Sequence, residues 1–180
     1  GSLGLSLGKS AAINASVGVN DIRNSVAAHI DGAKVVSTGG DVTVSATASA
    51  QDINIVVGGA VAAGGGNAFG GSFAINMIGN TIDAHIKAVG ANASDVSADG
   101  TVSVLAKDTA SIATLAGNIS ASFGGTAGVG FAFAVNSIQD SVTATIDGSM
   151  VEAKSGDIVV DATFAKPDAL PAGLDAQIAA

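Results

Sequence analysis

The chain has 180 residues, of which 48% are hydrophobic and 12% charged, and its formal net charge is −8. It contains no Cys, which excludes a disulfide framework and any cysteine-ligated metal. The acidic balance argues against nucleic-acid backbones and anionic lipid surfaces as partners, because both are recognised by clusters of Lys and Arg.

Small and β-branched residues dominate the chain, and they favour strands over helices. We expect Gly1-Ser2 to be a cloning remnant. We also expect a short strand at residues 33–36. Alternation of apolar and polar residues, the pattern of a half-buried strand, covers 26–30, 42–48, 102–106 and 158–162. Asp31-Gly32, Asp99-Gly100 and Asp147-Gly148 are typical of tight turns. Residues 165–180 contain both prolines, and we expect a linker or the start of another element there.

One motif recurs three times, at 19–32, 75–88 and 135–148. Its asparagines Asn20, Asn76 and Asn136 are 56 and 60 residues apart. Self-similarity at this period predicts a stacked array in which each unit buries its apolar face against its neighbours. The expected domain spans 3–164, with repeats at about 3–38, 39–98 and 99–164.

Two stretches, 53–82 and 109–139, carry no charged residue. Each has glycines at its centre, with bulky residues at odd positions and Gly, Ala, Ser or Asn at even positions. This pattern predicts two long strands joined at a glycine-rich apex. Because the parity of the apolar residues switches near Asp52 and Asn76, we expect a bulge or bend at both places.

Two all-β folds explain the pattern. The first is a β-solenoid, similar to a parallel β-helix, of about three repeats of 56–60 residues. The second is a stack of long antiparallel β-hairpins. The equivalent residues Asn24, Asn80 and Asp140 favour the solenoid, because a polar residue within an apolar row needs a like neighbour one rung away to bond with. We therefore predict a structural ladder of these three side chains.

The phrase Ala-Val-Asn-x-Ile-x-x-Ser-Val-x-Ala-x-Ile-x-Gly at 134–148, followed by Gly-Asp-Ile-Val-Val-Asp-Ala at 156–162, resembles repeats of giant bacterial surface adhesins. These are the leukotoxin-type and filamentous-haemagglutinin-like proteins, and the resemblance covers about residues 3–164. It implies an exported filament at the cell surface built as a β-solenoid. It carries over no binding residue, and the long period leaves the number of coils per repeat open.

Residues that suit chemistry are few. His29 and His85 are equivalent, but the third copy has Thr145, so we interpret them as residues of a solvated strand face. Asp31, Asp41, Asp147 and Asp157 adjoin turn glycines, where a carboxylate commonly accepts bonds from nearby backbone N–H groups. Asp41 and Asp157 are weak candidates for calcium; no catalytic or cofactor-binding residue is expected.

The sequence thus predicts a non-enzymatic structural or adhesive stalk segment of a large secreted bacterial surface protein. Its expected partners are neighbouring repeats of the same protein, a host or other cell surface, and other copies joined end to end, but not nucleic acid. One alternative is a membrane-active, pore-forming or toxin segment in which 53–82 and 109–139 insert as hairpins. A second alternative is a calcium-stiffened adhesin module.

Overall fold

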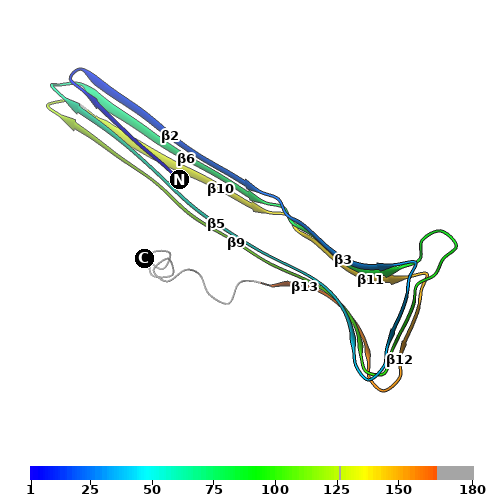
Figure 1. Ribbon diagram of the computed structural model, residues 1–180. Helices are drawn as coiled ribbons and strands as arrows, with labels where there is room; N and C mark the ends of the chain where they lie inside the picture. Colours follow the sequence, from blue (N-terminus) through cyan, green and yellow to red (C-terminus); the bar gives the residue numbers. More distant parts are fainter. Residues whose placement is uncertain (126, 166–180) are drawn as a thin grey trace.

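The computed structural model describes residues 1–125 and 127–165, which form strands and turns with no helix (Figure 1). No described segment is therefore a helix long and apolar enough to cross a membrane. The strands are β1 (Ser2–Gly8), β2 (Ala11–Ile22), β3 (Ser25–Asp31), β4 (Lys34–Ser37), β5 (Val42–Ala63), β6 (Asn67–Ile78), β7 (Thr81–Lys87), β8 (Asp95–Ala98), β9 (Val102–Phe123), β10 (Gly128–Ile138), β11 (Ser141–Asp147), β12 (Met150–Ala153) and β13 (Ile158–Ala165).

The strands form four parallel sheets, which the chain visits in a fixed order. Sheet A contains β1, β5, β9 and β13; sheet B contains β2, β6 and β10; sheet C contains β3, β7 and β11; and sheet D contains β4, β8 and β12. In each sheet a strand pairs with its equivalent from the next repeat. Ile30, Ile86 and Ile146, for example, are register partners in sheet C.

The antiparallel-hairpin alternative is wrong. Val57 pairs with Leu3 and Gly117 in sheet A, whereas Phe73 pairs with Val17 and Phe133 in sheet B. The strands before and after each glycine apex therefore lie in different sheets. The alternation of residues is the same in both folds, so it could not distinguish them.

One end of the molecule, the triangular end, has three walls, made by sheets C and D and by the part of sheet A that comprises residues 42–51, 102–111 and 158–165 (Figure 1). Its inward side chains form an ordinary apolar core. The buried members of that core are Val44, Ala46, Ala48, Ile82, Ala84, Ile86, Val96, Ala98, Val102, Val104 and Ala106. Burial of these side chains is the main source of stability in this part of the fold.

The other end, which we call the fin, comprises residues 1–22, 53–78, 113–125 and 127–138. Here sheet A faces sheet B directly, in two thin layers (Figure 1). Most inward residues are small or polar: Ala60, Ala62, Ala68 and Ala12 form one buried cluster, and Asn54, Ser72 and Asn76 are also buried. The larger inward side chains are Val56 and, next to the bend, Ile78. Only such small side chains allow the two sheets to lie so close together.

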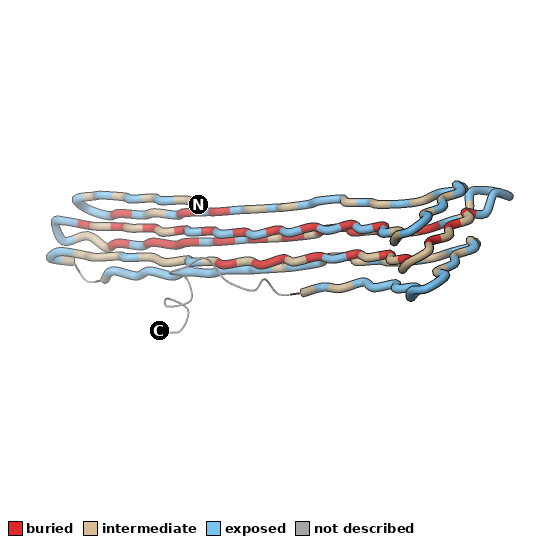
Figure 2. The backbone as a smooth tube through the Cα atoms, turned by 60° about the horizontal axis from the view of Figure 1, so that its bottom comes forward, coloured by how far each residue is buried: buried red, intermediate tan, exposed pale blue. Residues whose placement is uncertain are grey.

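The bulge or bend expected near Asp52 is absent, whereas the chain does bend at Gly79-Asn80, close to Asn76. β5 runs unbroken for 22 residues, and its even-numbered residues are buried from Val44 to Ala62. Figure 2 shows the resulting alternation of buried and exposed residues along the long strands. In β6 and β7 the even-numbered residues are likewise buried on both sides of the bend at Gly79-Asn80. The orientation of the side chains thus stays constant, and it is their chemistry that reverses: apolar residues face inward at the triangular end and outward in the fin.

The unequal repeat spacing originates at the triangular end. Seven residues separate β7 from β8, whereas two separate β3 from β4 and β11 from β12. The extra residues form a small loop closed by an antiparallel bridge between Val89 and Asn92. Because the loop projects from the strand stack, the register in the fin is undisturbed.

Candidate functional site

A column of asparagines runs through the base of the fin. Asn20, Asn76 and Asn136 are register partners in sheet B. The side-chain amide of Asn76 lies 3.3 Å from that of Asn20 and 2.9 Å from that of Asn136. Such a column satisfies buried amide groups that would otherwise be costly to desolvate.

Residues of sheet A complete this network. Asn20 Nδ2 donates to Asp52 Oδ1 at 2.6 Å, and Asn54 and Thr114 each lie 2.6 Å from the amide of Asn76. Asp52, Asn54 and Asn76 are almost fully buried. The polar groups therefore join sheet A to sheet B where the two layers begin.

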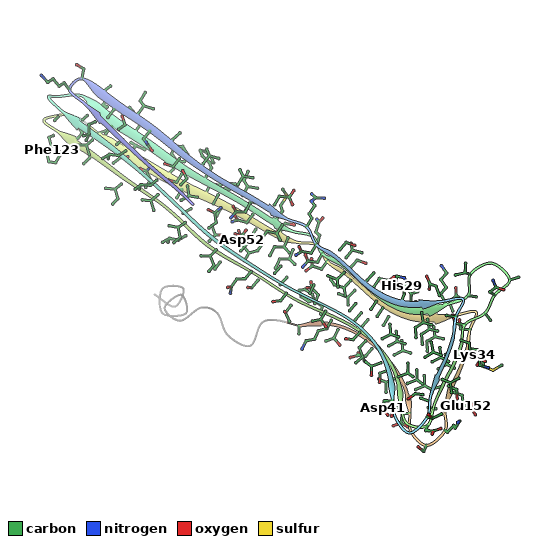
Figure 3. The ribbon with its side chains drawn as sticks, viewed as in Figure 1. His29, Lys34, Asp41, Asp52, Phe123 and Glu152 are labelled. Atoms are coloured by element: carbon green, nitrogen blue, oxygen red, sulfur yellow. The ribbon has the colours of Figure 1, made fainter. Side chains whose placement is uncertain are left out.

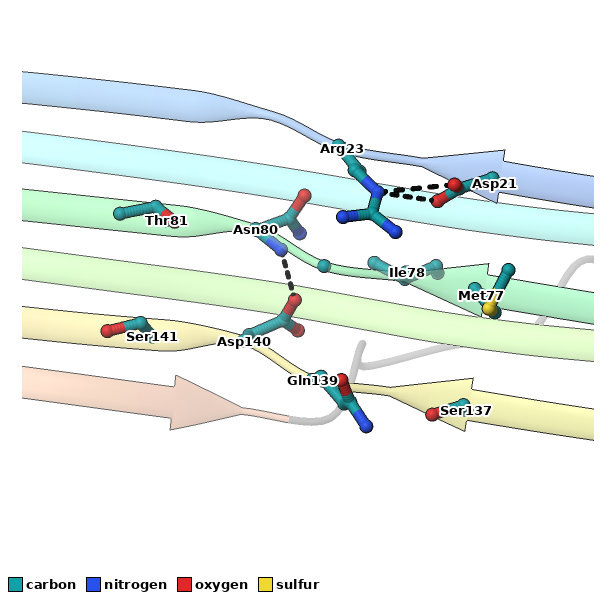
Figure 4. A pocket seen from close by; sticks show the side chains of 11 residues that line it. Asp21, Arg23, Met77, Ile78, Asn80, Thr81, Ser137, Gln139, Asp140 and Ser141 are labelled. Atoms are coloured by element: carbon teal, nitrogen blue, oxygen red, sulfur yellow. Dashed lines mark hydrogen bonds and ion pairs between the residues drawn. The ribbon is translucent and has the colours of Figure 1, made fainter.

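The predicted ladder lies at the bend between sheets B and C. Asn24 Nδ2 donates to Asn80 Oδ1 at 3.0 Å. The next contact differs, because Asp140 Oδ1 accepts from the backbone N–H of Asn80 at 2.6 Å (Figure 4). The structure brings these three residues together, although the aspartate bonds to the backbone instead of continuing a chain of side chains.

A buried carboxyl group adjoins this ladder. Asp108 has no exposed surface, and Asn80 Nδ2 lies 3.3 Å from both of its oxygens. Burial, followed by the neighbouring Asp140 carboxylate, raises the pKa of Asp108 above its ordinary range, and the bond from Asn80 opposes this effect. Because Asp140 Oδ2 is buried with no other partner, a proton on Asp108 is stabilised at this position.

On the outer side of the bend there is a shallow concavity of about 430 Å³, lined by Arg23, Asp21 and Gln139 among others (Figure 4). Arg23 Nε donates to Asp21 at 3.0 Å, and both side chains are largely exposed. The concavity follows from the kink between sheets B and C. Its polar groups bond chiefly to one another, and they form neither a nucleophile with its base nor a ligand set.

The two histidines lie on the outer face of sheet C. Their rings stack at 5.3 Å, and His85 is held between Asp83 at 2.6 Å and Asp31 at 3.0 Å. Figure 3 places His29 on the outside of the triangular end. These contacts involve only His and Asp side chains and include no nucleophile. They hold the side chains of neighbouring strands in fixed positions on the surface.

The two calcium candidates, Asp41 and Asp157, lie in different turns. Asp41 Oδ1 accepts the backbone N–H of Thr101 at 2.7 Å, while Asp157 contributes its backbone to the turn, accepting from Val102 N–H at 2.9 Å. Within the described residues, no group of three or more His, Asp or Glu side chains is placed to hold a metal ion.

The largest unexplained surface is the outside of the fin. Its two faces carry exposed apolar side chains (Figure 3, where Phe123 marks the tip). Those on sheet A include Leu3, Leu5, Leu7, Ile55, Leu115, Ile119 and Phe123; those on sheet B include Ile13, Val17, Val19, Phe69, Phe73, Phe131 and Phe133. Contiguous exposed apolar side chains of this kind mark a surface that another molecule covers.

Sequence reasoning missed two of these features. The column of Asn20, Asn76 and Asn136 was visible as an identical residue in all three copies of the motif, at a parity that faces inward. The outward position of the bulky residues was also present in the unbroken odd-even alternation. Either pattern could have been interpreted correctly only if the small residues had been assigned to the interior of the fin.

Comparisons of the chain with family models, with curated proteins and with solved structures find no match. The functional conclusion therefore depends on the geometry of the chain itself.

Proposed function

We propose that this chain is a segment of a β-solenoid stalk in a large exported surface protein, and that its role is structural or adhesive and not enzymatic. The observation that carries the proposal is the in-register stacking of equivalent residues in all four sheets. The resemblance of residues 134–148 and 156–162 to adhesin repeats supports the same assignment.

The ends of the stack favour continuation. β2, β3 and β4 at one end, and β10, β11 and β12 at the other, each pair on one side only. An unpaired parallel edge is a template for a further strand. Further repeats of a parent protein would satisfy these edges without changing the cross-section.

The length of the strands determines how many layers such a stalk needs. β5 has 22 residues, or about 73 Å at about 3.3 Å per residue, whereas each layer adds only about 4.8 Å along the hydrogen-bond direction. The stack becomes longer than it is wide only beyond about 15 layers. A projecting stalk therefore requires a parent protein with many more repeats than this chain holds.

Electron microscopy of the concentrated chain tests the proposal. We expect rods of constant width that lengthen by edge pairing, with a fibre-diffraction repeat of about 4.8 Å along the rod. Particles that remain single at all concentrations, or that grow only sideways, would contradict it.

An edge variant makes this test specific. Ser141 N–H and Asp147 C=O both point toward β7, so by alternation the N–H of Ala144 points to the open edge of β11. Ala144→Pro removes that donor while keeping the internal ladder, and it should stop elongation. Ala144→Ser retains the N–H and should still elongate.

A further inference from the structure

The outer face of sheet B is the most continuous apolar surface of the fin. Three strands present four outward rows, and the second row from the tip is Ala15, Gly71 and Phe131. Ten of the twelve positions are large apolar residues with exposed fractions from 37% to 74%: Ile13, Val17, Val19, Phe69, Phe73, Ile75, Val129, Phe131, Phe133 and Val135.

The face is also uncharged. The strands that form it carry one charged side chain, Asp21, which lies one row beyond these four, next to the bend. The chain as a whole has a net charge of −8, which opposes association elsewhere, whereas two copies of this face meet without like-charge repulsion.

We propose that this face binds the same face of a second copy of the chain, in an antiparallel two-fold arrangement. The proposal goes beyond the stalk function, because it joins stalks side by side through sheet B and leaves the strand edges unused.

Geometry favours this pairing. With the two-fold axis along the second row, Phe131 meets Phe131 of the partner subunit, and Phe73 meets Phe69 of the partner subunit. The first three rows then pair with one another, and the row of Val19, Ile75 and Val135 lies beyond them. Phe131 also covers Gly71 and lies edge-on to Phe73, with ring centroids 5.4 Å apart. Aromatic side chains held in this way supply large contact area at little entropic cost.

The same arrangement brings opposite charges together at the margins. Lys9, at the tip of the fin, comes opposite Asp21 of the partner subunit, at the base of its fin. Asp21 already bonds Arg23, so this contact fixes the direction of the pair more than it strengthens it.

The area agrees with a weak, extendable interface. Twelve outward positions cover about 380 Å² in projection, and the protruding side chains raise the accessible area above that value. This projected area is below about 500 Å² per partner, the practical minimum for a specific interface, so two single chains should associate only weakly. Since each further repeat adds four positions, or about 130 Å², association should tighten with the length of the stalk.

A lipid bilayer is the other apolar environment that such a face could meet. The open edges of β2 and β10 argue against it, because lipid leaves unpaired backbone groups unsatisfied. The chain also lacks the Trp and Tyr residues that mark membrane interfaces.

Charge complementation tests the proposal. All variants carry Ala144→Pro, so that edge pairing does not contribute, and sedimentation equilibrium measures the dissociation constant. Phe131→Asp and Phe131→Lys should each raise that constant at least tenfold, because each places like charges at the two-fold axis. An equimolar mixture of the two should restore association to within a few-fold of the parent.

Phe123 provides the matched control. It is 64% exposed on the opposite face of the fin, and Phe123→Asp should leave the dissociation constant unchanged. Circular dichroism of each variant verifies the fold. If the mixture fails to restore association, or if both aspartate variants weaken it equally, the proposed pairing is overturned.

Flotation with phosphatidylcholine vesicles tests whether a lipid bilayer covers this face instead. We expect the chain to stay with the aqueous fraction. Vesicle binding that is reduced equally by Phe131→Asp and Phe123→Asp would assign both faces to lipid and overturn the proposal, while leaving the test of the stalk by end-to-end elongation unaffected.

Discussion

The carboxyl group of Asp108 is buried beside that of Asp140, where sheet A passes under the bend between sheets B and C. The equivalent position of the preceding strand is Ala48. The stack accommodates an ionisable group here because Asn80 Nδ2 donates to the Asp108 carboxyl group and the Asp140 carboxylate favours its protonated form.

This relationship predicts that stability depends on pH. The pKa of Asp108 in the folded chain is raised above its ordinary value of 3.8, so the folded state binds the proton more tightly than the unfolded state. The resulting stabilisation is complete below pH 3.8 and is lost as the pH rises through the folded-state pKa. Asp108→Asn should remove this dependence and stabilise the chain at pH 7.

Urea unfolding between pH 4 and pH 8 checks this prediction. Asp147→Asn, on an exposed edge strand, is the control and should retain the slope of the parent. If Asp108→Asn is less stable than the parent at pH 7, the charged carboxylate stabilises the folded chain by more than its burial costs, and the prediction is wrong.

The asparagine column at the base of the fin should matter most in its central member. Asn76→Ala leaves the polar groups of Asn54, Thr114 and Asn20 without their shared partner. Unsatisfied buried groups of this kind cost about 2–3 kcal/mol. Asn136→Ala changes the exposed edge member of the same column and should cost less than half as much in the free energy of unfolding.

The isoleucine column of sheet C allows a similar comparison at the triangular end. Ile86 is fully buried, whereas Ile146 packs on the same core from the edge strand. Ile86→Ala should lower the free energy of unfolding by about 2–5 kcal/mol because it leaves a cavity that cannot collapse. Ile146→Ala should lower it clearly less, and equal losses would indicate that the edge is covered in solution.

Two glycines of the fin test which side of each strand faces inward. A Cβ at Gly70 would clash with the amide of Asn118, whereas a Cβ at Gly117 would meet nothing within 4 Å. We expect Gly70→Ala to destabilise the chain by about 1–3 kcal/mol. Gly117→Ala should be neutral or slightly stabilising, because it lowers the entropy of the unfolded chain. Thermal melts of the two variants compare them directly.

Calcium should have no effect on stability. The Asp41 carboxylate is used by the backbone of Thr101, and Asp157 lies in a separate turn. The melting temperature should be the same in excess calcium and in chelator. An increase of several degrees with calcium would restore these turns as candidate sites.

The sequence alone predicted much of the local structure. Alternation indicated the strands, Gly64 and Gly124 marked the apices, and the three-fold motif indicated that equivalent residues lie in register. It did not reveal that Val57 and Phe73 belong to different sheets, because side-chain alternation is identical in parallel and antiparallel pairing.

The reversal of chemistry in the fin was misread for a physical reason. Bulky apolar residues normally face a core, so the odd positions around Phe69 and Phe73 suggested that the strand had shifted by one residue. The backbone makes no such shift. The small residues form the interior because the two sheets approach closely, as at Gly70, where a Cβ would meet the Asn118 amide of the facing sheet.

The small-residue interior of the fin has a thermodynamic consequence. Forming it removes little hydrocarbon from water, so the fin contributes little to the heat capacity change of unfolding, which comes mainly from the isoleucine- and valine-lined triangle. Amide protons of the fin should therefore exchange with deuterium well before those of the triangle. A molecule that covers the fin would bury its outer apolar side chains. The fin should then be protected from hydrogen exchange and unfold together with the triangular end.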